Sequence, residues 1–326
     1  MAAPGGNSKF YIRLFAAVLL LSASLYLLSG SISGLFSDKV FREKLDAVLP
    51  SSPEAADLSS TYVGLSAIVD PEMDKKWTCD ELNRLSEGLK VFIGDEADPE
   101  LIIKKYNDYF FDTLSFRYDE KYNALLAGKQ EGAGPDLEDA INYESAYRVL
   151  KSRHGICLSL SMIYLVMAEK LKIPIYGVVL PGHFHVRYQD NSHSSINAEP
   201  TSGGSNQYNN FEYFDYKGRF GIETIDENRA IYNKTLSKYE TIGVLLNNFS
   251  DILIRKGEYR NAKLMLEKSV LMAPGLAESH DNLGLVLYVV GDRAGAEAQF
   301  NAALAILPED KTASGYLEKL SKGGNL

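Results

Sequence analysis

The stretch that decides the fold is HGICLSLSMIYLVMAEKLKIPIYGVVLPGHFHVRY, residues 154–188 of the chain. Its first half, from Cys157 to Lys172, is apolar on nearly every side, which predicts a helix buried on all faces. Its second half contains the short β-branched run IYGVVL and the alternating run HFHVRY, both typical of strands. We therefore predict an α+β domain in which a central helix packs on an antiparallel sheet.

The strand pattern continues after this stretch. The polar run QDNSHS suits the tip of a hairpin, and SSINAE alternates like a further strand. Within HFHVRY, alternation places His183, His185 and Arg187 on one face of the sheet. Two of the five histidines of the chain therefore share a face.

The region ahead of the central helix is predicted to be helical. Residues 61–112 show helical spacing of apolar side chains, and Asp98 followed by Pro99 is a typical helix start. After a long loop, residues 142–153 form a further predicted helix that stops at Gly155.

The C-terminal third contains an internal repeat with a period of 34 residues. Small, large and turn-forming residues recur at matching positions: Gly257, Ala262, Leu266 and Pro274, then Gly291, Ala296, Phe300 and Pro308. This pattern resembles tetratricopeptide repeats. We predict an all-α module over residues 231–322, with repeats at about 241–274 and 275–308 and a polar closing helix. The resemblance implies that a protein or peptide partner binds in the concave groove of the module.

Residues 1–37 are predicted to be a signal peptide or a membrane anchor. Lys9 and Arg13 precede the uncharged run from Leu14 to Phe36, which is long enough to span a bilayer. Basic residues ahead of the run predict that the bulk of the chain lies outside the cytoplasm, in the periplasm if the source is a Gram-negative bacterium. We expect a secreted or membrane-anchored protein with a linker over residues 38–60.

The composition argues against several classes of function. The net charge is -9 at pH 7, and Lys and Arg do not cluster beyond the N-terminus, so we expect no nucleic-acid partner. The sequence has no glycine-rich phosphate loop. Cys79 and Cys157 do not have the spacing of a zinc-binding pair. We expect neither a cofactor nor a metal.

Cys157 is the candidate nucleophile. It opens the predicted buried helix, where unpaired N–H groups and the helix dipole stabilise a thiolate. The strand HFHVRY can supply a base, and Glu199 on the next strand can hold the tautomer of a histidine.

The order of Cys, then Gly-His on a strand, then an acid before Pro-Thr resembles the transglutaminase-like superfamily. More narrowly, FDTLSFRYDEKY, INYESAYRVLKSRHGICLSLSMIYLVMAEKLKI and GVVLPGHFHVRY are similar to its bacterial SirB-type branch, which often carries C-terminal tetratricopeptide repeats. The resemblance covers roughly residues 62–223 and the repeats. It implies a papain-like fold, which we place at residues 61–230, and thiol-dependent acyl transfer.

The resemblance also assigns roles to single residues. Cys157 falls at the nucleophile position, His183 at the Gly-His position of the base, and Glu199 at the acid position, where the family usually has Asp. His185 occupies a place where an aromatic residue is more usual, so we expect a supporting or incidental role. His154, just before Gly155, is a second supporting candidate that could line the cleft.

Other interpretations of these residues remain open. His183 and His185 with a nearby carboxylate could bind zinc, although this does not explain Cys157. Glu199 could simply cap the turn at Pro200. The domain as a whole could be a non-catalytic binding module, since many SirB-type proteins lack the cysteine. Peptide or amide hydrolysis and transamidation use the same three residues, so the sequence leaves the acceptor open.

Overall fold

The computed structural model describes residues 38–119, 121, 137–204 and 230–322. The chain divides into two units, residues 1–44 and residues 45–326. In the first unit, the described residues 38–44 are helical. The predicted signal or anchor run, Leu14 to Phe36, lies outside the described residues. Within the described ranges, no helix combines the length and the apolar character that a membrane crossing requires.

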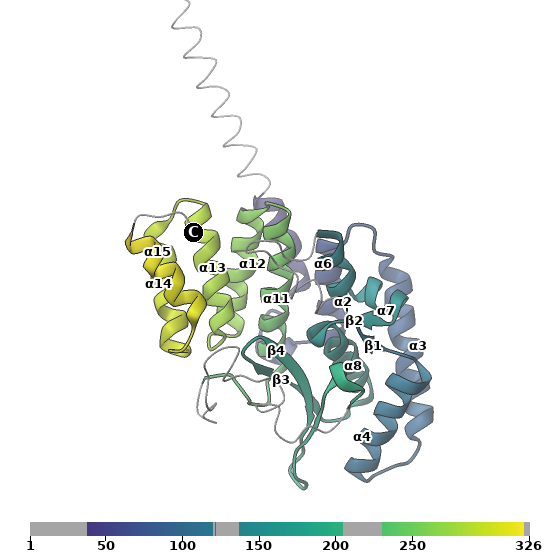
Figure 1. The fold of residues 1–326 in the computed structure, drawn as a ribbon. Coiled ribbons are helices and arrows are strands. Elements are labelled where there is room, and N and C mark those ends of the chain that lie inside the picture. Colours follow the sequence, from purple (N-terminus) through teal and green to yellow (C-terminus); the bar gives the residue numbers. More distant parts are fainter. Residues whose placement is uncertain (1–37, 120, 122–136, 205–229, 323–326) are drawn as a thin grey trace, which may run out of the picture. The chain divides into compact units, whose positions relative to one another are not determined.

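The second unit is mostly helical and contains two small sheets (Figure 1). Its N-terminal half comprises η1 (Pro53–Ala55), α2 (Leu58–Val69), α3 (Lys75–Ile93), α4 (Pro99–Asn107), the π-helical turn η2 (Asp108–Thr113), β1 (Arg117–Tyr118), α6 (Leu137–Glu144), α7 (Ala146–Ser152), β2 (His154–Gly155) and α8 (Cys157–Leu171). The strands β3 (Ile175–Leu180), β4 (His183–Tyr188) and β5 (Ile196–Ala198) follow, with η3 (Pro200–Ser202) after them. The C-terminal helical region comprises α11 (Lys238–Arg255), α12 (Tyr259–Met272), α13 (Ala277–Val289), α14 (Arg293–Ile306) and α15 (Lys311–Ser321).

The predicted central helix is confirmed as α8. Its side chains from Leu158 to Ala168 are all buried, because α2, α3 and α7 pack against it together with strands β3 and β4. The hydroxyl of Ser159 accepts the backbone N–H of Ile156 at 3.0 Å and so fixes the start of the helix. The position of Cys157 is therefore set by the most buried element of the unit.

Strands β3, β4 and β5 form an antiparallel sheet with β4 in the middle. Leu180 pairs with His183, so only Pro181 and Gly182 connect β3 to β4. Gly182 has a φ of +68°, which suits the third position of a type II turn after proline. This tight turn places His183 at the very start of the central strand.

Two predicted boundaries differ from the structure. The predicted linker of residues 38–60 contains Leu45 and Leu58, whose side chains are buried, so it is not a solvated connection. The predicted helix of residues 142–153 is broken at Ser145, whose hydroxyl donates to Asp70 at 2.9 Å, and α7 ends at Ser152. In both places, contacts distant in sequence decide the local structure.

The C-terminal helices α11–α15 form a row of antiparallel helices, and α11 packs against β3 (Figure 1). The starts of α12 and α14 are separated by 34 residues, as are their ends. Ala262 and Ala296 are both fully buried at equivalent places in these helices. A Cβ atom at Gly284 of α13 would lie 2.6 Å from the ring of Phe300, so this glycine permits close packing with α14.

Candidate active site

Cys157 is the first residue of α8, and its side chain is partly exposed. Because α8 begins at this residue, the backbone N–H groups of its first turn have no partners within the helix. These groups and the helix dipole favour negative charge on a sulfur at this position. Cys157 is a free thiol, as is Cys79 on α3.

His183 connects the thiol to the carboxylate of Glu199. The imidazole hydrogen-bonds with the side chain of Cys157, and its Nε2 atom lies 2.7 Å from Oε2 of Glu199. Because Nε2 is occupied by Glu199, Nδ1 is the nitrogen left for the thiol. Only 7% of His183 is exposed and 1% of Glu199, so this hydrogen bond is shielded from water.

Glu199 has a structural role as well. Its Oε1 atom accepts the backbone N–H of Thr201 at 3.0 Å and the hydroxyl of Thr201 at 2.7 Å, which caps η3. The two sequence interpretations of Glu199, turn cap and partner of the histidine, are therefore both present, one on each oxygen. The bonds to Thr201 also fix the direction in which Oε2 faces His183.

The charges at this site favour the imidazolium form of His183. Burial alone would lower the pKa of His183, but its hydrogen bonds to Cys157 and Glu199 and their negative charges raise that pKa to about 9. Burial would likewise raise the pKa of Glu199, but the bond to His183 and its positive charge hold that pKa below its usual value. At neutral pH His183 therefore holds a proton beside the carboxylate of Glu199.

His185 lies beside His183 but differs from it in protonation and in hydrogen bonding. The two rings are 6.1 Å apart between centroids and nearly parallel. His185 is fully buried, and burial lowers its pKa to about 3, so the ring is neutral. Neither ring nitrogen has a hydrogen-bonding partner of ordinary geometry among the described residues, although the side chain of Asn197 is close enough to interact with it. His185 thus packs beside His183 without a hydrogen bond to it.

The donor atoms of His183, His185 and Glu199 all lie within 4.8 Å of one another, which raises the question of a metal. A tetrahedral zinc ion with ligands at about 2.0–2.2 Å needs donors separated by about 3.3 Å. The distance of 2.7 Å between His183 and Glu199 is instead that of a hydrogen bond. The geometry therefore fits a hydrogen-bonded pair better than a metal site.

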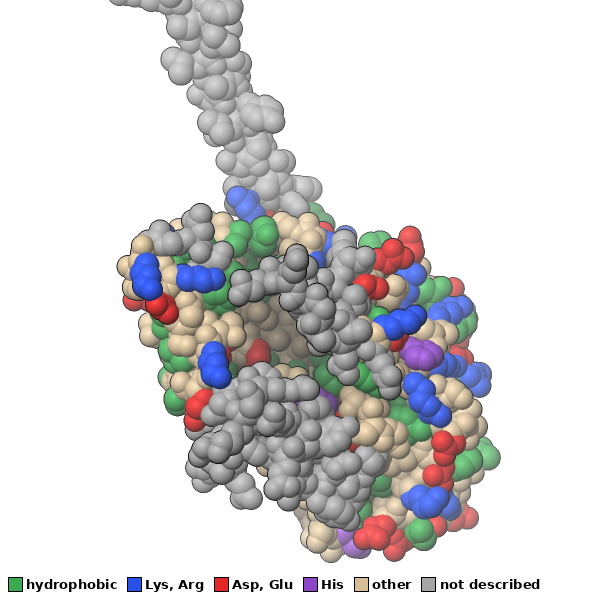
Figure 2. Space-filling view, viewed as in Figure 1, with side chains coloured by type: hydrophobic (Ala, Val, Ile, Leu, Met, Phe, Trp, Pro, Cys, Tyr) green, Lys and Arg blue, Asp and Glu red, His purple; other side chains and the backbone are tan. Residues whose placement is uncertain are grey.

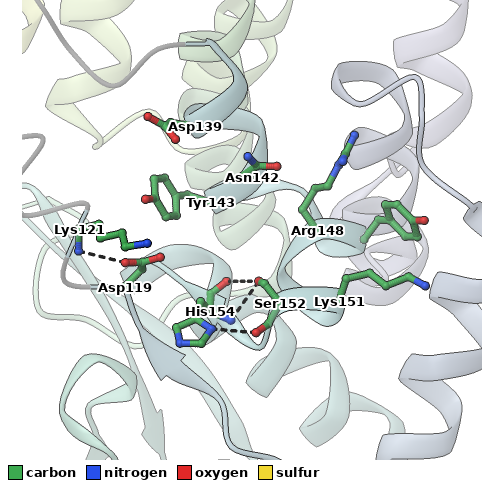
Figure 3. A pocket seen from close by; sticks show the side chains of 10 residues that line it. Asp119, Lys121, Asp139, Asn142, Tyr143, Arg148, Lys151, Ser152 and His154 are labelled. Carbon is green, nitrogen blue, oxygen red and sulfur yellow. Dashed lines mark hydrogen bonds between the residues drawn. The ribbon is translucent and has the colours of Figure 1, made fainter.

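His154 does not lie where the sequence places it. It lines a separate cavity of about 670 Å³, with Asp119, Arg148 and Lys151 among the other lining residues (Figure 3). Its ring is exposed, and its Nδ1 atom lies 2.8 Å from the carbonyl oxygen of Ser152. The cavity that contains Cys157 and His183 does not include it. His154 belongs to the surface at the end of α7 and not to the cleft.

One wall of the cavity at Cys157 was not predicted from the sequence. This cavity has a volume of about 240 Å³, and the C-terminal helical region contributes Val244, Asn247, Asn248, Leu276 and Glu278 to its lining. The face drawn in Figure 2 is hollowed beside the C-terminal helices. The sequence signal was the adjacent pair Asn247 and Asn248 inside an otherwise apolar stretch of α11.

Glu278 of α13 connects this wall to the candidate base. Its Oε1 atom accepts the backbone N–H of Gly182 at 3.0 Å, directly before His183, and its Oε2 atom accepts the hydroxyl of Tyr232 at 2.5 Å. The C-terminal helical region therefore holds the turn that positions His183.

A known family model matches the centre of the chain. Residues 139–214 match the family model described as the transglutaminase-like superfamily. The matched segment contains Cys157, His183 and Glu199, and also helix α8 and the three-stranded sheet. This bears out the superfamily expected from the sequence.

Two curated relatives share the name UPF0162 protein. The one from Buchnera aphidicola subsp. Schizaphis graminum is 24% identical over 216 residues, which are 66% of this chain and 70% of the relative. The one from Xylella fastidiosa is 25% identical over 162 residues, which are 49% of this chain and 57% of the relative. Their name states no activity.

One solved structure is similar in fold. It is titled "Crystal structure of menin reveals the binding site for Mixed Lineage Leukemia (MLL) protein". The TM-score is 0.52 at 13% sequence identity, and the similarity covers 87% of this chain and 66% of menin. At this identity the likeness concerns the fold alone.

Proposed function

We propose that this protein carries out thiol-dependent acyl transfer, with Cys157 as nucleophile, His183 as general base and acid, and Glu199 as the group that orients the imidazole. The observation that carries the proposal is the position of His183, which bonds to the thiol of Cys157 and lies 2.7 Å from Glu199 through Nε2. The match to the transglutaminase-like superfamily supports the same assignment. Cys157 also lines a cavity that a substrate can enter, which supports the proposal further.

The proposed reaction has two stages. The thiolate of Cys157 attacks a carbonyl carbon, and the N–H groups at the start of α8 stabilise the oxyanion of the tetrahedral intermediate. His183 donates its proton to the leaving amine, which gives a thioester. A water molecule or a second amine then attacks the thioester, His183 accepts the proton of the attacking group, and Cys157 leaves as thiolate. The same residues serve hydrolysis and transamidation.

We also propose the finer assignments of the fold. The matched segment would be a papain-like domain of the SirB-type branch, and α11–α14 would be two tetratricopeptide repeats closed by α15. The equal spacing of α12 and α14 and the buried alanines Ala262 and Ala296 support the repeats. A protein or peptide would be the partner of the repeats.

A second candidate function is a non-catalytic binding module. The similarity of the fold to menin, whose title names a binding site for the MLL protein, favours this alternative. The buried bond between His183 and Glu199 would then be structural, and Cys157 would have no enhanced reactivity.

Export or membrane anchoring remains our proposal for the location of the protein. It rests on Lys9 and Arg13 ahead of the apolar run from Leu14 to Phe36. Protease added to cells whose outer layer has been opened, with the inner membrane intact, should digest the chain after Asp38 if the proposal holds. Protection of this part until the inner membrane is lysed would place it in the cytoplasm.

The thiol provides the test of the enzymatic proposal, because Cys79 is a control in the same molecule. Iodoacetamide should alkylate Cys157 faster than Cys79 at pH 7, as measured by quantitative peptide mass spectrometry over time. His183→Ala should slow alkylation of Cys157 and leave Cys79 unchanged. Equal rates at the two cysteines, unaffected by His183→Ala, would reject the nucleophile and favour the binding module.

A further inference from the structure

The cavity at Cys157 lies between two parts of the chain that are distant in sequence. Cys157 and His183 form one side, and α11 and α13 form the other. Its volume of about 240 Å³ is below the ~300–1,000 Å³ typical of sites that enclose a whole ligand. A cavity of this size suits a short segment of a longer molecule.

Asn247 and Asn248 of α11 line the same cavity as the thiol and are held by hydrogen bonds to other helices. The Oδ1 atom of Asn247 accepts the side-chain N–H of Asn282 at 3.0 Å. The Nδ2 atom of Asn248 donates to Oε1 of the buried Glu144 at 3.3 Å. Burial raises the pKa of Glu144 to about 8, so this carboxyl is largely neutral. These bonds leave Nδ2 of Asn247 as a donor and Oδ1 of Asn248 as an acceptor for a ligand.

The remaining lining of the cavity is apolar or already bonded. Val244 and Leu276 accompany the two asparagines, while both oxygens of Glu278 accept bonds from Gly182 and Tyr232. Among the described lining residues there is no Lys or Arg. A phosphate or a free carboxylate would find no basic side chain here other than His183, which is bonded to Cys157 and Glu199.

We infer that Asn247 and Asn248 form a subsite for the main-chain amide of an uncharged, extended peptide segment. Nδ2 of Asn247 would donate to the peptide carbonyl, and Oδ1 of Asn248 would accept the peptide N–H. A buried amide needs both a donor and an acceptor, and leaving either unpaired is costly. The inference rests on the proposed function, because the subsite would present a neighbouring carbonyl of the same peptide to Cys157.

Two alkylating reagents that share one reactive group test the subsite. Chloroacetone has a chloromethyl ketone and no amide, whereas N-acetyl-dialanyl chloromethyl ketone adds a short neutral peptide. In both, the thiolate attacks the chloromethyl carbon, the carbon–sulfur bond forms, and chloride leaves with the electrons of the carbon–chlorine bond. The ratio of the two rates at Cys157, divided by the same ratio at Cys79, measures what the peptide contributes.

In the unmodified protein this normalised ratio should be about tenfold or more, as two amide hydrogen bonds would give. Asn247→Asp replaces the donor with an acceptor of the same shape and keeps an oxygen for Asn282, so the ratio should fall close to one. Asn301→Asp, on the exposed surface of α14, is the matched control and should keep the full ratio. If Asn247→Asp lowers the melting temperature, Asn247→Leu is the second variant. It adds no charge and should lower the ratio in the same way.

Failure of the proposed function and failure of the subsite give different results. If chloroacetone alkylates Cys157 no faster than Cys79, the proposed function fails. If Cys157 is the faster thiol but the peptide reagent has no preference for it, or if the preference survives both Asn247 variants, the subsite is overturned and the proposed function stands.

Discussion

The cavity at Cys157 and the cavity at His154 differ in how their polar groups are bonded. The first, of about 240 Å³, has a largely apolar lining, and within it His183 bonds to Cys157. The second, of about 670 Å³, is lined mainly by polar side chains that are exposed or half-buried. In this cavity, Arg148 forms an ion pair at 3.0 Å with Asp70, which is not itself a lining residue. The ammonium of Lys151 lies 4.0 Å from the centroid of the Trp77 ring.

The difference shows that the number of charged residues is a poor guide to chemistry. In the larger cavity, water solvates the charges and nearby partners neutralise them, which weakens each electrostatic interaction. In the smaller cavity, burial strengthens each interaction, and the pKa of His183 moves to about 9. Substitutions should therefore have large effects in the first cavity and small ones in the second.

Glu199→Gln should have the largest effect. The amide oxygen of Gln can still accept both bonds from Thr201, but its NH₂ group would face Nε2 of His183 and favour the wrong tautomer. Alkylation of Cys157 by iodoacetamide at pH 7 should fall by about 10–30-fold, because an unactivated thiol is only a few per cent thiolate at this pH. The rate is measured by peptide mass spectrometry, with Cys79 as internal reference.

Glu297→Gln on the exposed face of α14 is the control for this substitution. It should leave the rate at Cys157 unchanged. If Glu199→Gln also leaves that rate unchanged but lowers the melting temperature, Glu199 serves only as the cap of η3. A dyad of Cys157 and His183 would then remain.

The pH dependence of stability gives the next largest effect. The pKa of His183 is raised from 6.5 to about 9 in the folded protein, so its stabilisation is complete below pH 6.5 and is lost as pH rises through 9. The free energy of unfolding should fall by a few kcal/mol between these limits. Urea unfolding at pH 6.5 and pH 9.5 measures the fall, and His183→Asn should reduce it. A fall of equal size in His183→Asn would assign the pH dependence to other groups.

The central part of the fold could be predicted from the sequence because its patterns are local. The all-round apolar character of α8, the alternation of β4 and the Pro181–Gly182 turn are each visible within a few residues. The pairing of His183 with Glu199 followed from the adjacency of two strands. His154 was misplaced because Arg153, with a φ of +61°, ends α7 and turns the chain, and nothing local in the sequence indicates this.

The wall formed by Asn247, Asn248 and Glu278 could not be predicted for a different reason. The bond from Gly182 to Glu278 spans 96 residues, and it depends on how the C-terminal helices pack beside the strands. Periodicity predicts the helices themselves but not which of their faces meets the site. The two asparagines were visible only as polar residues in an apolar helix.

His185→Phe should have a moderate effect, of opposite sign to the substitutions above. It removes two buried nitrogens without ordinary hydrogen bonds, each a cost of about 1–3 kcal/mol, while the larger ring offsets part of the gain. A net gain of about 1 kcal/mol would raise the melting temperature by about 2–4 °C at pH 7. The gain should grow at pH 5, because the pKa of His185 is about 3 when folded and the unfolded chain takes up the proton first.

Differential scanning calorimetry at both pH values checks this expectation, with His193→Gln on the exposed hairpin tip as control. A lower melting temperature of His185→Phe at both pH values would show that the imidazole has a bonding partner in solution. If zinc ions raised the melting temperature of the unmodified protein but not of this variant, that partner would be a metal, and the hydrogen-bonded pair would need revision.

His154→Ala should have the smallest effect. The ring is exposed, and it contacts the carbonyl oxygen of Ser152 in its own turn, so its removal should change the free energy of unfolding by no more than about 0.5 kcal/mol. The alkylation rate of Cys157 should stay within about twofold, since no bond of the ring reaches the thiol cavity. A tenfold slower rate would mean that His154 acts on Cys157 through the two residues between them. The supporting role expected from the sequence would then be restored, and the two cavities would be parts of one site.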